Sequence, residues 1–156
     1  MGIGKEAAEQ LKEETVARQQ QFQAASDRAA LTAQNKEANW SALVTALQRD
    51  VAEFVENFPP AQTQYLQADL LNSNNLTIAT RVQPLLKIEV LRDYQRSGVV
   101  VITMRQKRGY EDTVGETPTF GYVPEGFTDG SRVYTPEQFA SEILEDVTEF
   151  FRPDTN

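Results

Sequence analysis

The sequence predicts an α+β fold: a long N-terminal helix or helix pair, an antiparallel β-meander of four to five strands, and a C-terminal helix packed on the sheet. Three observations lead to this prediction. Residues 5–58 contain no proline and are dominated by helix-forming side chains. From residue 76 the apolar side chains follow a period of two, which is typical of strands. After residue 135 the spacing returns to that of a helix.

The N-terminal helical segment has two unlike halves. In residues 40–58 apolar side chains recur every three or four positions, so this half is expected to pack on the core. In residues 5–39 the large apolar side chains thin out to Leu11, Val16, Phe22 and Leu31. A helix with so narrow a stripe is marginal in water unless another surface covers it. The sequence therefore predicts a polar helical arm over residues 1–39 and an α+β domain over residues 40–156.

Part of the arm also follows a heptad spacing. The positions concerned are Leu11, Thr15, Arg18, Phe22, Ala25 and Ala29. Because Thr15 and Arg18 are polar, they weaken the apolar seam that a coiled coil requires. The arm is therefore expected either to fray or to pack on another chain, and its partner-binding side chains are predicted to be Leu11, Phe22 and Leu31.

Two prolines, Pro59 and Pro60, are expected to end the helix, because proline supplies no amide donor and restricts the residue before it. Pro60 is suited to the first turn of a further helix, which is predicted to run through Leu71. The run 72–75, with three asparagines and a serine, predicts a turn.

Five strands are predicted, at about residues 76–82, 86–95, 99–110, 118–123 and 131–134. A three-residue loop at 96–98, ending in Gly98, suits a type I turn followed by a left-handed glycine. Counting back from that loop places Arg92 opposite Ile102 and Glu89 opposite Arg105. The same count predicts that Arg105 and Glu89 form an ion pair across the hairpin.

The last third of the chain is predicted to contain a hairpin and a helix. Asp129-Gly130 suits a tight turn between residues 127–128 and 131–132. Thr135 is the predicted N-cap of the final helix, with Pro136 in its first turn and Gln138 completing a capping box. The apolar stripe that follows predicts that the helix covers the sheet.

Charge is unevenly distributed in a chain of formal net charge -8. Residues 76–110 hold seven basic and two acidic side chains, whereas residues 111–156 hold two basic and eleven acidic ones. Cations interleaved with aromatic rings can bind anions, so a ligand or anion patch is predicted at Arg105, Lys107, Phe120 and Tyr122. Nucleic acid is nonetheless disfavoured as a partner, because the chain is acidic overall and carries no known nucleic-acid motif.

The chain contains no histidine and no cysteine, which removes the most common general base, the thiol nucleophile and the most common transition-metal ligands. The acidic residues Glu111, Asp112 and Glu116 do not match a calcium-loop spacing. No cofactor and no metal are therefore predicted. No apolar run approaches the length of a membrane span, and a cytoplasmic location is expected.

The leading functional hypothesis is a non-enzymatic interaction or assembly protein that docks on a protein partner, or forms a homo-oligomer, through its N-terminal helix. The first alternative is a binding module that holds a small ligand or nucleic acid on its sheet face and aromatic loops. The second is a histidine-free hydrolase that uses Asp or Glu side chains, which requires two carboxylates in a cavity.

Overall fold

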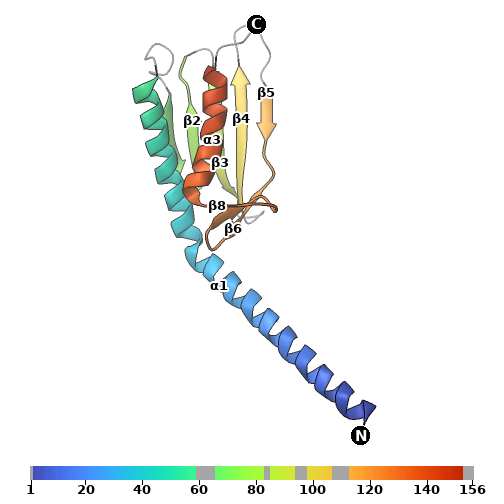
Figure 1. Cartoon of the computed structure of the whole chain (residues 1–156). Coiled ribbons are helices and arrows are strands. Elements are labelled where there is room, and N and C mark those ends of the chain that lie inside the picture. The colour runs from blue at the N-terminus through green and yellow to red at the C-terminus, as the bar shows by residue number, and fades with distance from the viewer. Residues whose placement is uncertain (1, 59–65, 83–84, 94–97, 107–112, 153–156) are drawn as a thin grey trace.

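The computed structural model describes residues 2–58, 66–82, 85–93, 98–106 and 113–152, and it confirms the α+β class (Figure 1). The N-terminal segment is one α-helix, α1 (Ile3–Asn57), of 55 residues. It crosses residue 39 without a break, so both predicted halves belong to the same helix. Its C-terminal half lies on the sheet, whereas its N-terminal half extends away from the rest of the chain (Figure 1).

The described residues form eight strands, more than the four to five predicted. They are β1 (Gln67–Asn72), β2 (Asn75–Ala79), β3 (Leu85–Asp93), β4 (Gly98–Gln106), β5 (Thr113–Glu116), β6 (Phe120–Val123), β7 (Gly126–Thr128) and β8 (Val133–Tyr134). All pairings are antiparallel, in the order β1-β2-β3-β4-β6-β7-β8, and β5 also pairs with β4. The additional strands are short, and short strands give little periodic signal in a sequence.

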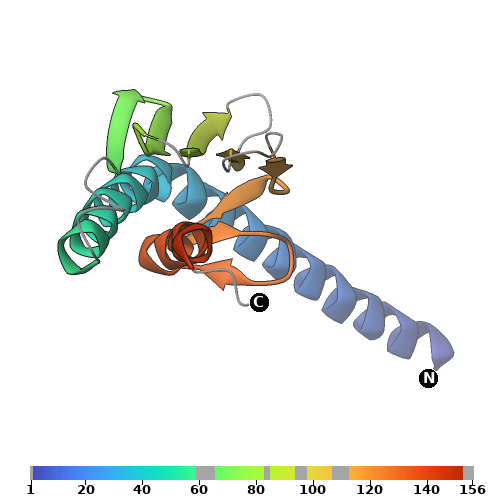
Figure 2. The same ribbon diagram turned by 90° about the horizontal axis from the view of Figure 1, so that it is seen from above.

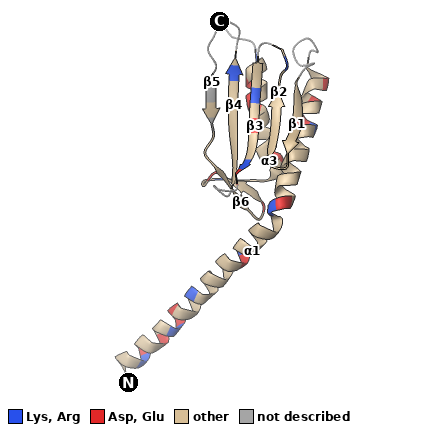
Figure 3. Cartoon of the chain, turned by 180° about the vertical axis from the view of Figure 1, so that it is seen from behind, with Lys and Arg blue, Asp and Glu red and all other residues tan. Residues whose placement is uncertain are grey.

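Two helices cover the same face of the sheet (Figure 2). They are the C-terminal half of α1 and α3 (Pro136–Phe151), which pack against each other as well as on the strands. The core between them is formed by apolar side chains of α1, β2, β3, β4, β7 and α3. In the part of the chain that the structure describes, no helix covers the opposite face (Figure 3).

The predicted short helix between Pro60 and Leu71 is wrong where the structure describes it. Residues 67–71 belong to strand β1, while residues 60–65 lie outside the described residues. β1 and β2 form a hairpin around the predicted asparagine turn, where the backbone N–H of Asn74 donates to the side chain of Asn72. Pairing with β2 gives the backbone N–H and C=O groups of this segment hydrogen-bond partners. This pairing outweighs the weak helical pattern of the leucines.

The predicted register between β3 and β4 is also wrong. Asp93 faces Gly98, and Arg92 faces Val99 rather than Ile102. The observed register differs from the predicted one by an odd number of residues. Relative to β3, each side chain of β4 therefore lies on the opposite face of the sheet from the one predicted. Gly98 does not adopt a left-handed conformation; instead a Cβ there would overlap the carbonyl oxygen of Phe120 in β6. Gly98 therefore allows β4 and β6 to lie close together.

The C-terminal helix forms as predicted. The Thr135 side chain accepts from the backbone N–H of Gln138, whose side chain accepts from the N–H of Thr135, completing the capping box. The preceding loop is longer than the predicted two-residue turn, because β7 ends at Thr128 and β8 begins at Val133. Asp129 accepts hydrogen bonds from Ser131 and Arg132 in this loop, and these bonds lower its pKa to about 2.

Within the described residues, no helix combines the length and the apolar character that crossing a bilayer requires.

Candidate interaction site

The N-terminal part of α1 forms a free arm, which we define as residues 3–27. Every side chain of the free arm is exposed. The first bond to the rest of the chain is made just beyond it, where the Arg28 guanidinium donates to both carboxylate oxygens of Glu125, at 3.1 and 3.0 Å. The free arm is therefore a helix of about seven turns that no other described part of the chain covers.

Large apolar side chains are exposed along this helix. Leu11 is 63% exposed, Phe22 is 77% exposed and Leu31, just beyond the arm, is 49% exposed. At about 100° per residue, Leu11 and Phe22 lie on one side of the helix, whereas Leu31 lies about half a turn away from Phe22. The three predicted partner-binding residues therefore do not share one face. Leu11 and Phe22 together define the arm stripe.

The arm stripe continues the face by which α1 packs on its own sheet. Phe22 and the buried Trp40 are eighteen residues apart, which is about five full turns of an α-helix. Leu11 and the buried Leu47 are separated by about ten turns. The face that is covered by the sheet in the C-terminal half of α1 is thus uncovered in the free arm.

A polar collar separates the free arm from the domain. Asn35 donates to the carbonyl oxygen of Pro124 at 3.2 Å, and Asn39 donates to Val123 and Pro124 at 3.3 Å each. The ammonium of Lys36 lies 5.0 Å from the centre of the Tyr122 ring. With the Arg28 pair, which lowers the pKa of Glu125, these contacts fix α1 to the β6–β7 turn.

A buried arginine of β3 fixes the same part of α1 to the β1–β2 turn. The side chain of Arg92 is 5% exposed, and its guanidinium donates to Glu37 at 2.6 Å, to the Ser73 carbonyl at 2.8 Å and to Asn74 at 3.1 Å. It also lies 5.1 Å from the ring centre of Trp40. We define these five residues as the Arg92 anchor. The alternation of Ile88, Val90 and Arg92 indicates a core-facing arginine, but nothing in the sequence identifies its partners.

The predicted ligand or anion patch is largely on the face that the helices cover. Phe120 packs against Phe139 of α3, with ring centres 4.4 Å apart, and Tyr122 packs against Phe127 at 5.3 Å. Arg105 lies 3.8 Å from Asp146 of α3. Lys107 lies outside the described residues. The described members therefore contribute to the packing between the sheet and the helices.

The predicted ion pair between Arg105 and Glu89 is wrong, because the register places Arg105 opposite Leu86. Glu89 instead pairs with Lys87 of the same strand at 3.0 Å. Burial raises the pKa of Asp146 despite the opposing effect of Arg105. The described cations of residues 76–110 do not gather on one face of the sheet.

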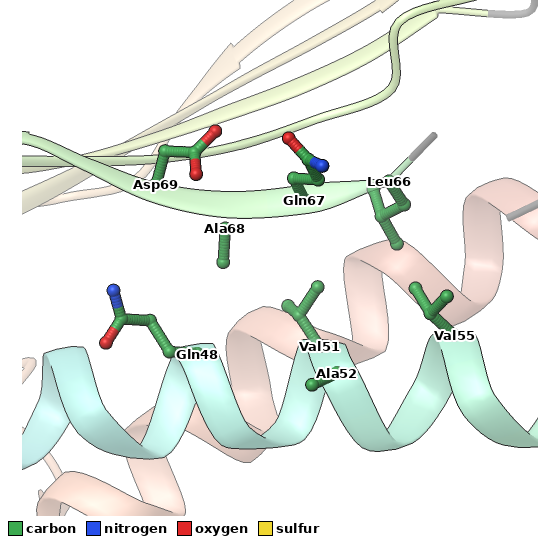
Figure 4. Close-up of a pocket in the computed structure, with 8 residues that line it drawn as sticks. All are labelled: Gln48, Val51, Ala52, Val55, Leu66, Gln67, Ala68 and Asp69. Atoms are coloured by element: carbon green, nitrogen blue, oxygen red, sulfur yellow. The ribbon is translucent and has the colours of Figure 1, made fainter. Parts of the chain in front are cut away.

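A groove of about 450 Å³ runs between α1 and β1 (Figure 4). Its lining consists of Gln48, Val51, Ala52, Val55, Leu66, Gln67, Ala68 and Asp69. The side chains of Leu66 and Ala68 point toward the helix, whereas Asp69 points away from it (Figure 4). Asp69 is the one carboxylate among these described lining residues, and the hydrolase alternative requires two. No group of three or more acidic side chains suited to a metal ion occurs among the described residues.

Comparison with known proteins gives no match: no protein-family model, no curated protein and no solved structure is significantly similar to this chain.

Proposed function

We propose that the protein is a non-enzymatic assembly protein whose N-terminal helix packs on another chain. The observation that carries this proposal is the exposure of Phe22, at 77%, on a stripe shared with Leu11, in a helix that no other described part of the chain covers. Helices in proteins gain most of their stability from packing an apolar face. A covering chain would supply that packing and bury both side chains.

The energetic gain from covering the stripe is substantial for so polar a helix. Full burial of a leucine or phenylalanine side chain is worth about 1.5–3 kcal/mol relative to exposure. Because Leu11 is 63% exposed and Phe22 is 77% exposed, the two together would contribute roughly 2–4 kcal/mol per arm. The absence of histidine and cysteine from the chain supports a structural role over a catalytic one.

The test compares the mass in solution of the full chain with that of the variant Leu11→Ser/Phe22→Ser, by sedimentation equilibrium over a range of concentrations. Val16→Ser provides a matched control, because Val16 is an apolar residue of the arm, 50% exposed, that lies off the stripe. The double variant should associate at least about a hundredfold more weakly, whereas the control should behave like the wild type.

The proposal is contradicted if the arm is equally helical in a monomeric wild type and in the double variant. That result would show that the helix needs no covering chain. Far-ultraviolet circular dichroism on the same samples measures this property.

A second candidate is a binding module that uses the uncovered face of the sheet. The observation in its favour is that Leu91, Ile102 and Met104 lie half-buried on that face beside the Lys87–Glu89 pair. Titration with a mixed-sequence oligonucleotide tests the nucleic-acid form of this proposal. Binding that weakens steeply with salt would favour it, and an absence of binding at low salt would contradict it.

A further inference from the structure

We infer that the covering chain is a second copy of this protein, and that the two free arms pair as an antiparallel coiled coil over residues 4–29. This inference rests on the proposed function, because it identifies the partner of the same stripe. It commits to one orientation and one register, both of which follow from the order of side chains along the arm and from the position of the domain.

The heptad positions of the arm, which would form the seam of a coiled coil, match those of a second copy that runs in the opposite direction. Antiparallel pairing in which facing residue numbers sum to 33 brings seam positions together as Gly4 with Ala29, Ala8 with Ala25, Leu11 with Phe22, and Thr15 with Arg18. Small residues thus face small ones, large apolar residues face each other, and polar residues meet at the centre. Thr15 and Arg18, which weaken the apolar heptad pattern of one arm, meet at the two-fold axis of this dimer.

Other antiparallel registers lose this match. A shift by one heptad in one direction places Leu11 opposite Ala29 and Phe22 opposite Arg18. The opposite shift places Leu11 opposite Thr15 and Phe22 opposite Gly4. In both cases the two large apolar side chains are separated, and Phe22 faces either a cation or no side chain. The polar centre therefore sets the register by penalising the alternatives.

The parallel orientation brings like charges together. Parallel pairing places Arg18 directly against Arg18 of the other copy, and like charges facing each other in a seam are destabilising. It also places both domains at the same end of the pair, on the side of each helix that faces the partner. Beyond Lys36, which lies over Tyr122, that side of α1 is already covered by its own sheet, so the two domains would crowd each other there.

The antiparallel pair avoids this conflict. Gly4 of one arm lies opposite Ala29 of the other, so each arm ends beside the collar, where Arg28 binds Glu125. The pair spans roughly 38 Å at about 1.5 Å per residue, and the two domains lie at opposite ends. The pairing over residues 4–29 thus uses nearly the whole free arm and extends two residues beyond it, to Arg28 and Ala29.

Disulfide cross-linking tests the orientation directly, because the natural chain has no cysteine and each variant therefore carries one thiol. Ala8→Cys and Ala25→Cys are prepared as full chains, one of them isotopically labelled, and are oxidised separately and as a mixture. The mixture should form a dimer that joins the two variants. Each variant alone should form little, because identical positions lie roughly 25 Å apart in this register.

The control mixture replaces Ala8→Cys with Val16→Cys, which lies off the seam and should not cross-link with Ala25→Cys. A homodimeric disulfide of Ala25→Cys would show parallel pairing and overturn the inference. A mixture that stays uncross-linked at concentrations where the wild type is dimeric would overturn the register. In both of these cases, association that is lost in Leu11→Ser/Phe22→Ser would leave the proposed function standing. A wild type that is monomeric at every concentration overturns self-pairing itself.

Discussion

Replacing Arg92 by methionine removes the buried guanidinium that fixes α1 to the β1–β2 turn. Methionine keeps the aliphatic stem of arginine as far as the position of Nε but lacks the guanidinium, so it carries no charge and donates no hydrogen bond. The perturbation therefore removes the hydrogen bonds of the Arg92 anchor and the guanidinium contact with the Trp40 ring, while it keeps the packing of the stem. It matters for function because this anchor and the collar together set the direction in which α1 leaves the domain.

The expected cost follows from the geometry of the anchor. The bonds to the Ser73 carbonyl and the Asn74 side chain, at 2.8 and 3.1 Å, are charge-assisted and worth about 1.5–3 kcal/mol each. The pair with Glu37 adds about 0–1 kcal/mol, because Glu37 is 70% exposed. The variant no longer desolvates a guanidinium, which offsets a few kcal/mol of this loss. The net destabilisation is expected to be about 2 kcal/mol.

Thermal unfolding followed by circular dichroism should show the midpoint of Arg92→Met lowered by roughly 4–8 °C for a chain of this size. Lys87→Met is the matched control, because Lys87 lies on the same strand, alternates with the buried side chains of that strand and pairs with Glu89 at 3.0 Å. That exposed pair should contribute no more than about 1 kcal/mol. An Arg92→Met variant as stable as the wild type would refute the reasoning. The desolvation cost of burying the guanidinium would then equal the stabilisation that its hydrogen bonds provide.

Three further predictions concern the domain. Asp129→Ala should destabilise the protein at neutral pH, and the difference from the wild type should shrink as the pH falls from about 4 to about 2, because the pKa of Asp129 in the folded state is lowered; midpoints that differ equally at both pH values would contradict this. Asp146→Asn should be more stable than the wild type at neutral pH, and this difference in stability should narrow in acid. The pKa of Asp146 is raised in the folded state, so the wild type becomes more stable as the pH falls through that pKa. Urea titration at pH 7 and pH 4 measures whether the difference narrows or widens. Gly126→Ala should cost at least about 1–3 kcal/mol in urea titration, because Gly126 has φ of 151° and a Cβ would overlap the Tyr134 carbonyl oxygen, and an unchanged midpoint would disprove the strain.

Elements with a strong local signal could be predicted from the sequence. The helical character of residues 5–58 followed from 54 proline-free residues rich in helix formers, although this pattern fits one helix or two, and α3 followed from a capping box and an apolar stripe. Strand pairing could not be predicted as well, because it depends on contacts distant in sequence. The β3–β4 register was inferred from Gly98 as a turn residue, whereas that glycine accommodates strand β6.

The candidate site also contains one part that the sequence predicts and another that it does not. The exposed stripe of the arm was predictable, because a sparse apolar pattern indicates a helix that its own chain does not cover. The collar and the Arg92 anchor were not, since asparagine, arginine and glutamate side chains have no periodicity that identifies a buried polar contact. Arg105 was assigned to a ligand patch because its charge was visible in the sequence, while its neighbour Asp146 lies forty-one residues further along the chain.

Amide hydrogen exchange of the free arm, measured at several protein concentrations, tests most directly whether another copy covers this helix. If the arms pair, the amides of residues 4–29 should be protected, and their protection should rise with concentration while that of the core strands stays constant. Arm amides that exchange at the rate of an unfolded chain at the highest concentration would contradict the account. Protection that is independent of concentration and unchanged in Leu11→Ser/Phe22→Ser would contradict it as well, because the helix would then be stable without a partner.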